Sequence, residues 1–208
     1  MTPEKTKEQL LASYDNEPGA ERAKKLAVIF PGIGYRTDKP LLYYAASLAR
    51  AHGYVIREVH YRGFPEEIRK TNTRGRKELM DLALAQTKEL LRAIPVRENG
   101  ELLFISKSVG TAVACDFASS LDRRVRHVLY TPLEETPLAG VSDAIAFHGT
   151  RDNYVRTGPL SLAMKEHGLR FHVFEGANHS LETGDALKDI SILSRVMKLT
   201  AAFLSSDT

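Results

Sequence analysis

The chain has 208 residues, a formal net charge of +3 at pH 7, a hydrophobic fraction of 43% and a charged fraction of 26%. This balance is typical of a soluble globular protein, and the length suits one domain with a sizeable core. The small charge, with no basic patch interleaved with aromatic residues, argues against nucleic acid as a partner. A single cysteine, Cys115, excludes an internal disulfide and fits a reducing compartment.

The N-terminal residues 1–24 alternate in charge and lack the apolar stretch of a secretory signal peptide. No apolar run approaches the roughly 18 residues that a membrane span needs. We therefore expect a cytoplasmic protein without a membrane partner. Residues 1–24 are predicted to form a peripheral segment with a helix near Lys5–Tyr14, and residues 25–208 a single domain.

From residue 25 onward, short apolar runs alternate with longer segments of helical period. The predicted strands are Leu26–Phe30, Tyr54–His60, Leu102–Ile105, Val125–Tyr130, Ala144–Phe147 and Phe171–Phe174. The predicted helices lie at about Pro40–His52, Arg74–Ile94, Gly110–Ser119, Leu160–His167 and Ala186–Leu204. This alternation predicts an α/β fold of three layers (α/β/α), with a mostly parallel sheet of about six strands.

In an open parallel sheet, functional residues gather in the loops at the carboxyl ends of the strands. Here these loops read "PGIGYRTDKP" after the first strand, "SKSVG" after the third, "HGTRDNYV" after the fifth and "EGANHSLE" after the sixth. They supply a glycine-rich turn, a serine, an aspartate and a histidine. A serine hydroxyl becomes a nucleophile when a base takes its proton and a third group orients that base.

Ser108 lies in S-x-S-x-G, a variant of the G-x-S-x-G elbow, in which a sharp strand-to-helix turn exposes the serine hydroxyl. Ser106 and Gly110 provide the small residues that such a turn requires. The helix that starts near Val109 directs its first N–H groups at the site, where they favour developing negative charge.

The order Ser108, Asp152, His179 is the Ser–acid–His order of α/β hydrolases. From about Lys25 to the C-terminus, the chain resembles that superfamily and in particular its small, cap-less members of the dienelactone-hydrolase kind. In the superfamily the serine follows the central strand, the acid the next-to-last strand and the histidine the last. The matching positions are Ser108, Asp152 in "HGTRD" and His179 in "GANHS", and the resemblance implies that they form a catalytic triad.

The loop "PGIGY" is similar to the oxyanion loop of the family, "HG-x-G", with proline in place of histidine. By that similarity, the oxyanion donors would be the backbone N–H of Ile33 or Gly34 and that of Val109. The two leading strands of the family have no candidates before Leu26, and no cap-domain insertion is visible. A minimal version of the fold is therefore expected.

The resemblance implies a serine hydrolase of the carboxylesterase kind, cleaving a small ester-like substrate through an acyl-enzyme with no metal or organic cofactor. Two alternatives stay open: a non-catalytic ligand-binding protein on a hydrolase scaffold, and an acyltransferase. The expected partner is a small-molecule substrate, and the oligomeric state is left undetermined. The loops after the first two strands, with Tyr35, Tyr61, Arg62 and Phe64, are predicted to shape the pocket wall.

Other titratable residues near these loops have alternative interpretations. Glu134 and Glu135 follow the fourth strand, from which some hydrolases supply the acid. His148 is expected to brace the loop of the acid. Lys107 precedes Ser108, and because neighbours in a sharp turn point apart, it is expected to be solvated.

Overall fold

One six-stranded sheet organises the structure, a computed structural model that describes residues 24–63, 73–92 and 100–206. The strand order is β2-β1-β3-β4-β5-β6, and each neighbouring pair runs parallel. The strands are β1 (Lys25–Phe30), β2 (Val55–Glu58), β3 (Glu101–Lys107), β4 (Arg126–Tyr130), β5 (Ala144–Gly149) and β6 (Arg170–Phe174). The helices are α2 (Pro40–Ala51), α3 (Thr73–Arg92), α4 (Val109–Ser119), α5 (Thr157–Glu166) and α6 (Ala186–Ser205). The helix expected near Lys5–Tyr14 falls outside the described residues.

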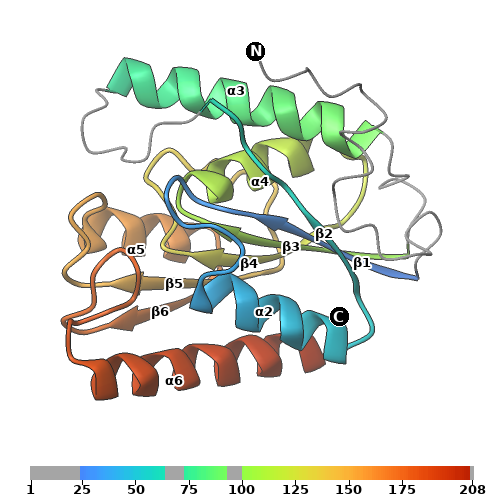
Figure 1. The fold of residues 1–208 in the computed structure, drawn as a ribbon. Coiled ribbons are helices and arrows are strands. Elements are labelled where there is room, and N and C mark those ends of the chain that lie inside the picture. The colour runs from blue at the N-terminus through green and yellow to red at the C-terminus, as the bar shows by residue number, and fades with distance from the viewer. Residues whose placement is uncertain (1–23, 64–72, 93–99, 207–208) are drawn as a thin grey trace, which may run out of the picture.

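Helices cover both faces of the sheet, with α3, α4 and α5 on one side and α2 and α6 on the other (Figure 1). The alternation of side chains along β1 shows how the sequence divides the core. Leu26, Val28 and Phe30 pack in the cluster on the side of α3 and α4, whereas Ala27 and Ile29 pack toward α2 and α6. Strands buried on both faces give continuous apolar runs, as the sequence has here. The predicted three-layer α/β/α fold is confirmed.

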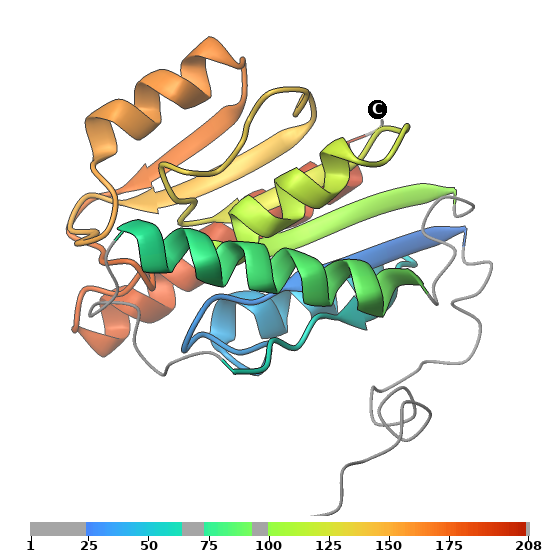
Figure 2. The same cartoon turned by 90° about the horizontal axis from the view of Figure 1, so that it is seen from above.

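The strand order reverses next to β1, and this places the candidate site. From β1 the chain passes to β2 on one side and then to β3 on the other. The loops after β1 and β3 therefore leave the sheet on opposite faces, which creates the crevice where open α/β sheets bind ligands. Figure 2, seen from above, shows α3 and α4 lying over the sheet and running roughly along the strands. Among the described residues, no helix is long and apolar enough to cross a membrane.

Candidate active site

A strained turn between β3 and α4 presents Ser108. Its backbone has φ 55° and ψ −124°, a positive φ that residues other than glycine seldom adopt. The turn also brings α4 against β1, since a Cβ at Gly110 would collide with the carbonyl oxygens of Phe30 and Pro31. Ser106 is buried, and its hydroxyl donates to the carbonyl of Val128 at 3.2 Å. The S-x-S-x-G segment thus has the geometry of a nucleophile elbow.

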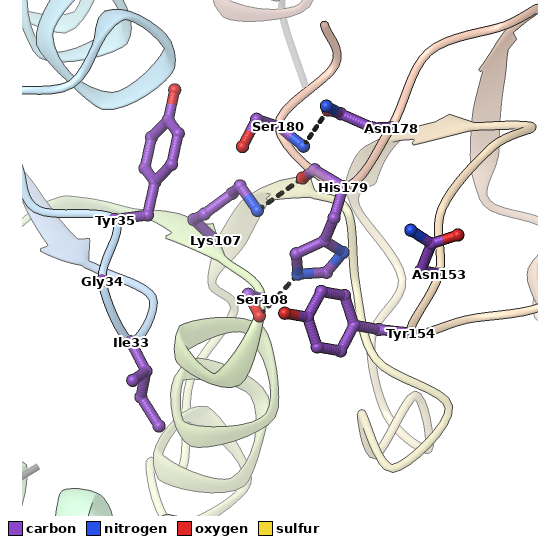
Figure 3. Close-up of a pocket in the computed structure, with 10 residues that line it drawn as sticks. All are labelled: Ile33, Gly34, Tyr35, Lys107, Ser108, Asn153, Tyr154, Asn178, His179 and Ser180. Atoms are coloured by element: carbon purple, nitrogen blue, oxygen red, sulfur yellow. Dashed lines mark hydrogen bonds between the residues drawn. The ribbon is translucent and has the colours of Figure 1, made fainter. Parts of the chain in front are cut away.

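Ser108, His179 and Asp152 form one chain of hydrogen bonds. The Ser108 Oγ lies 2.8 Å from His179 Nε2, and His179 Nδ1 lies 2.6 Å from Asp152 Oδ2. An ionised carboxylate can only accept, so Nδ1 carries the proton and Nε2 is left to accept from the serine hydroxyl. Figure 3 shows the His179 ring turned toward Ser108. The structure therefore brings together the three residues that the sequence singled out.

The loop after β5 fixes the Asp152 carboxylate. Its Oδ1 accepts from the backbone N–H of Tyr154 at 2.8 Å and of Val155 at 3.3 Å, which leaves Oδ2 for the imidazole. The side chain of Asp152 is fully buried. His148, the last residue but one of β5, lies with Nδ1 3.7 Å from Asp152 Oδ2 and Nε2 3.0 Å from Thr157 Oγ1. This arrangement agrees with the expectation that His148 braces the acid loop.

Burial and charge set the protonation of the pair. Desolvation lowers the pKa of His179 to about 4, and the nearby Lys107 ammonium acts in the same direction, while Asp152 opposes both. Burial alone would raise the pKa of the Asp152 carboxyl, but its hydrogen bond to His179 and its backbone contacts hold that pKa below the usual range. At neutral pH, the site therefore contains a neutral imidazole beside an ionised carboxylate, which are the forms that a general base and its orienting group require.

The turn after β1 faces the elbow. Gly32 and Tyr35 exchange two backbone hydrogen bonds, with N···O distances of 3.2 and 3.3 Å, and Gly34 has φ 70°. Ile33 and Gly34 line the same pocket as Ser108. Val109 is the first residue of α4, a position whose N–H has no partner inside the helix. The N–H groups of Ile33, Gly34 and Val109 therefore belong to two segments near Ser108, the turn after β1 and the start of α4.

A pocket of about 240 Å³ surrounds the hydroxyl. The described residues that line it are Ile33, Gly34, Tyr35, Lys107, Ser108, Asn153, Tyr154, Asn178, His179 and Ser180. Of the predicted wall residues, Tyr35 is among them. The structure places Tyr61 and Arg62 outside this lining: Tyr61 packs against the core, and the backbone of Arg62 bonds to the side chain of Gln86. Phe64 falls outside the described residues.

The sequence reasoning missed the wall that the loops of Asp152 and His179 contribute. The Tyr154 ring lies with its centroid 4.7 Å from that of His179. Asn178 accepts at Oδ1 from the backbone N–H of Ser180 at 2.7 Å and so shapes the turn that carries His179. Tyr154 lies two residues after Asp152, and Asn178 directly precedes His179. This closeness in sequence to the predicted triad could have identified both as pocket residues.

The alternative acids lie elsewhere. Glu134 Oε1 is 3.5 Å from Arg156 Nε, and the Glu134 side chain is 42% exposed. Glu135 is exposed and lines a separate pocket between α3 and α4. Neither glutamate takes part in the hydrogen bonds of His179. Among the described residues, no three His, Cys, Asp or Glu side chains gather into a possible metal site.

Lys107 contradicts the expectation that it would be solvated. The residue is 1% exposed, and its Nζ donates to Thr131 Oγ1 at 2.6 Å. The same Nζ donates to the carbonyl of His179 at 2.7 Å, as Figure 3 shows. The expectation was wrong because a side chain that points away from Ser108 at this position enters the core and not the solvent. Along β3, Lys107 continues the alternation of Leu103 and Ile105, which pack toward α2 and α6.

Solved structures share this fold, although no family model and no curated relative matches the chain. A Coxiella burnetii α/β serine hydrolase homologue has a TM-score of 0.66 at 14% identity, covering 90% of this chain and 88% of that one. A lidless α/β serine hydrolase from Xanthomonas campestris has a TM-score of 0.62 at 15% identity, covering 92% and 88%. An esterase from Pyrococcus furiosus has a TM-score of 0.59 at 14% identity, covering 88% and 85%. The chain has the α/β-hydrolase fold.

Proposed function

We propose that this protein is a serine hydrolase that cleaves a small ester-like substrate through an acyl-enzyme. The observation that carries the proposal is the hydrogen-bond chain from Ser108 Oγ through the imidazole of His179 to the buried carboxylate of Asp152. Such a chain supplies a nucleophile, a base and an orienting group in contact, and it is recognised by its geometry on unrelated folds. The named activities of the solved structures with this fold point in the same direction.

In the first step, Ser108 Oγ attacks the carbonyl carbon while His179 Nε2 takes the hydroxyl proton. Asp152 keeps the Nδ1 proton in place and stabilises the imidazolium that forms. The backbone N–H of Val109 and that of Ile33 or Gly34 bind the oxyanion, an effect of about 3 kcal/mol for a donor where one has been removed. The tetrahedral species collapses as His179 gives the proton to the leaving group, and the acyl group remains on Ser108.

In the second step, water takes the place of the leaving group. His179 Nε2 accepts a proton from the water, whose oxygen attacks the acyl carbon, and the proton then passes to Ser108 Oγ as the acid is released. Each step begins and ends with a neutral imidazole. The pKa of His179, lowered to about 4 by burial, supports this resting state at neutral pH.

The size and lining of the pocket support a small, polar substrate. Its volume of about 240 Å³ falls below the several hundred Å³ usual for drug-sized ligands. The segment 131–143 between β4 and β5 contains no helix, so a helical lid is missing from the place where this fold often carries one. With little apolar wall, each further methylene of a long acyl chain gains less than the usual value of about 0.8 kcal/mol.

Turnover of a panel of esters, thioesters and amides tests the proposal. We expect ester hydrolysis by the wild type and losses of similar size in Ser108→Ala and His179→Ala, because one change removes the nucleophile and the other its base. Combining the two changes should add little, since the members act as one unit. Product analysis with an added alcohol separates transfer to water from transfer to another acceptor. Near-wild-type turnover by Ser108→Ala would overturn the proposal.

A further inference from the structure

A charged side chain lies buried behind the catalytic histidine. Lys107 ends β3, and its Nζ donates to Thr131 Oγ1 at 2.6 Å and to the main-chain carbonyl of His179 at 2.7 Å. On its remaining side, the ammonium faces the ring of Tyr35, 5.0 Å from the centroid. An ammonium group has three N–H donors, and these hydrogen bonds use two of them. Lys107 therefore joins the loops after β1, β4 and β6 around one buried cation.

A buried ammonium destabilises the folded chain unless its charge is compensated. The titratable groups around it are Asp152 from the loop after β5, Glu182 and His179 from the loop after β6, and Tyr35 from the loop after β1. Burial lowers the pKa of Lys107 to about 7, and the charges of Asp152 and Glu182 oppose that shift. The side chain therefore carries its proton in the acidic range in which His179 titrates. Of the two carboxylates that compensate the charge, Glu182 is exposed. A methionine of similar length could fill the same space without a charge. Filling space therefore does not by itself explain a lysine at position 107.

Lys107 and Asp152 contact His179 at opposite ends of the residue. The ammonium binds the main-chain carbonyl of His179, while Asp152 binds the opposite, side-chain end of the residue at Nδ1. A carboxylate raises the proton affinity of an imidazole, and a nearby cation lowers it. The third titratable group near the ring, His148, lies in contact with Asp152, and burial lowers the pKa of His148, so it adds no charge at neutral pH.

We propose that Lys107 is a positioning residue for His179: it holds the histidine main chain in register with Ser108, and in its protonated form its positive charge disfavours a proton on Nε2. The inference rests on the proposed function, in which His179 is the base. Asp152 and Lys107 then act in opposite directions on the same imidazole. Their balance keeps Nε2 free to accept the proton of Ser108, with the imidazolium still accessible during attack.

The test is a titration of the His179 imidazole by NMR in protein labelled with ¹⁵N-histidine. The resonance is assigned by its loss in His179→Gln. We expect Lys107→Met to raise the titration midpoint by on the order of one pH unit, because a like charge next to the imidazole is removed. Lys107→Gln, which keeps a donor for the His179 carbonyl but has no charge, should raise it similarly. Thr131→Val is the matched control, since it removes one hydrogen bond of Lys107 and retains the charge, and its midpoint should stay close to that of the wild type.

Each outcome decides the inference. Unchanged midpoints in folded Lys107→Met and Lys107→Gln would overturn it, and so would the failure of both variants to melt cooperatively, because the role of Lys107 would then be structural. Hydrolysis of p-nitrophenyl acetate is measured on the same samples. A raised midpoint without any wild-type turnover would overturn the proposed function and leave the coupling in place. Turnover with unchanged midpoints would support the proposed function and overturn the inferred role of Lys107.

Discussion

Asp152→Asn separates the orienting role of the acid from its structural role. In the wild type, Oδ1 of Asp152 accepts from the N–H groups of Tyr154 and Val155, and Oδ2 lies 2.6 Å from His179 Nδ1. An asparagine can keep the Oδ1 contacts, which directs its NH₂ group at Nδ1. Two donors cannot face each other, so the imidazole moves its proton to Nε2. Nε2, 2.8 Å from Ser108 Oγ, is then a donor and can no longer serve as the base.

The expected loss in kcat is about 10,000-fold, which corresponds to about 5.4 kcal/mol of transition-state stabilisation. The assay is steady-state hydrolysis of p-nitrophenyl acetate, with thermal melting to show that the fold persists. Glu134→Gln and Glu135→Gln serve as controls and should change the rate little, since neither side chain contacts His179. A loss below about tenfold in folded Asp152→Asn would refute the reasoning. A large loss in either glutamine variant would transfer the role of the acid to the loop after β4.

Three further outcomes follow from the geometry. The kcat/KM of the wild type should stay nearly constant down to about pH 5 and fall as the pH passes through the His179 pKa of about 4, because only the neutral imidazole accepts the serine proton. A fall in kcat/KM centred at about pH 6.5, the usual pKa of histidine, would contradict the burial argument. Gly110→Ala should lower the free energy of unfolding by about 1–3 kcal/mol in urea denaturation, since the new Cβ meets the backbone carbonyls of β1 and its loop, whereas Gly158→Ala, with open space at its Cβ, should be tolerated. Across p-nitrophenyl esters from acetate to palmitate, kcat/KM should be highest for short acyl chains, and a maximum at ten carbons or beyond would reveal an acyl tunnel.

The sequence predicted the fold well because the strands of a parallel sheet are buried on both faces. Such strands read as unbroken apolar runs, and the helices between them show their own period. The positions of Ser108, Asp152 and His179 were predicted from the loop order together with the S-x-S-x-G motif and the resemblance to α/β hydrolases, since carboxyl ends of parallel strands share one edge of the sheet. The predicted second strand, Tyr54–His60, extends further than the observed β2, Val55–Glu58, which pairs only with β1 at the sheet edge.

The environment of individual side chains could not be predicted in the same way, because it depends on segments that are distant in sequence. The alternation along β3 indicates that Lys107 shares a face with Leu103 and Ile105. It gives no sign that Thr131 and the carbonyl of His179 converge on the ammonium from two other loops. Similarly, Tyr61 follows an edge strand, and the sequence alone does not decide whether such a residue turns toward the pocket or the core.

Labelling with a fluorophosphonate probe tests the central claim most directly, because the probe reacts only with a serine activated by its base. We expect the wild type to gain one probe mass, with the modification mapped by peptide mass spectrometry to Ser108. Labelling should be absent in Ser108→Ala and strongly slowed in His179→Ala. A well-folded wild type that remains unlabelled, or a label that persists in Ser108→Ala, would contradict the account.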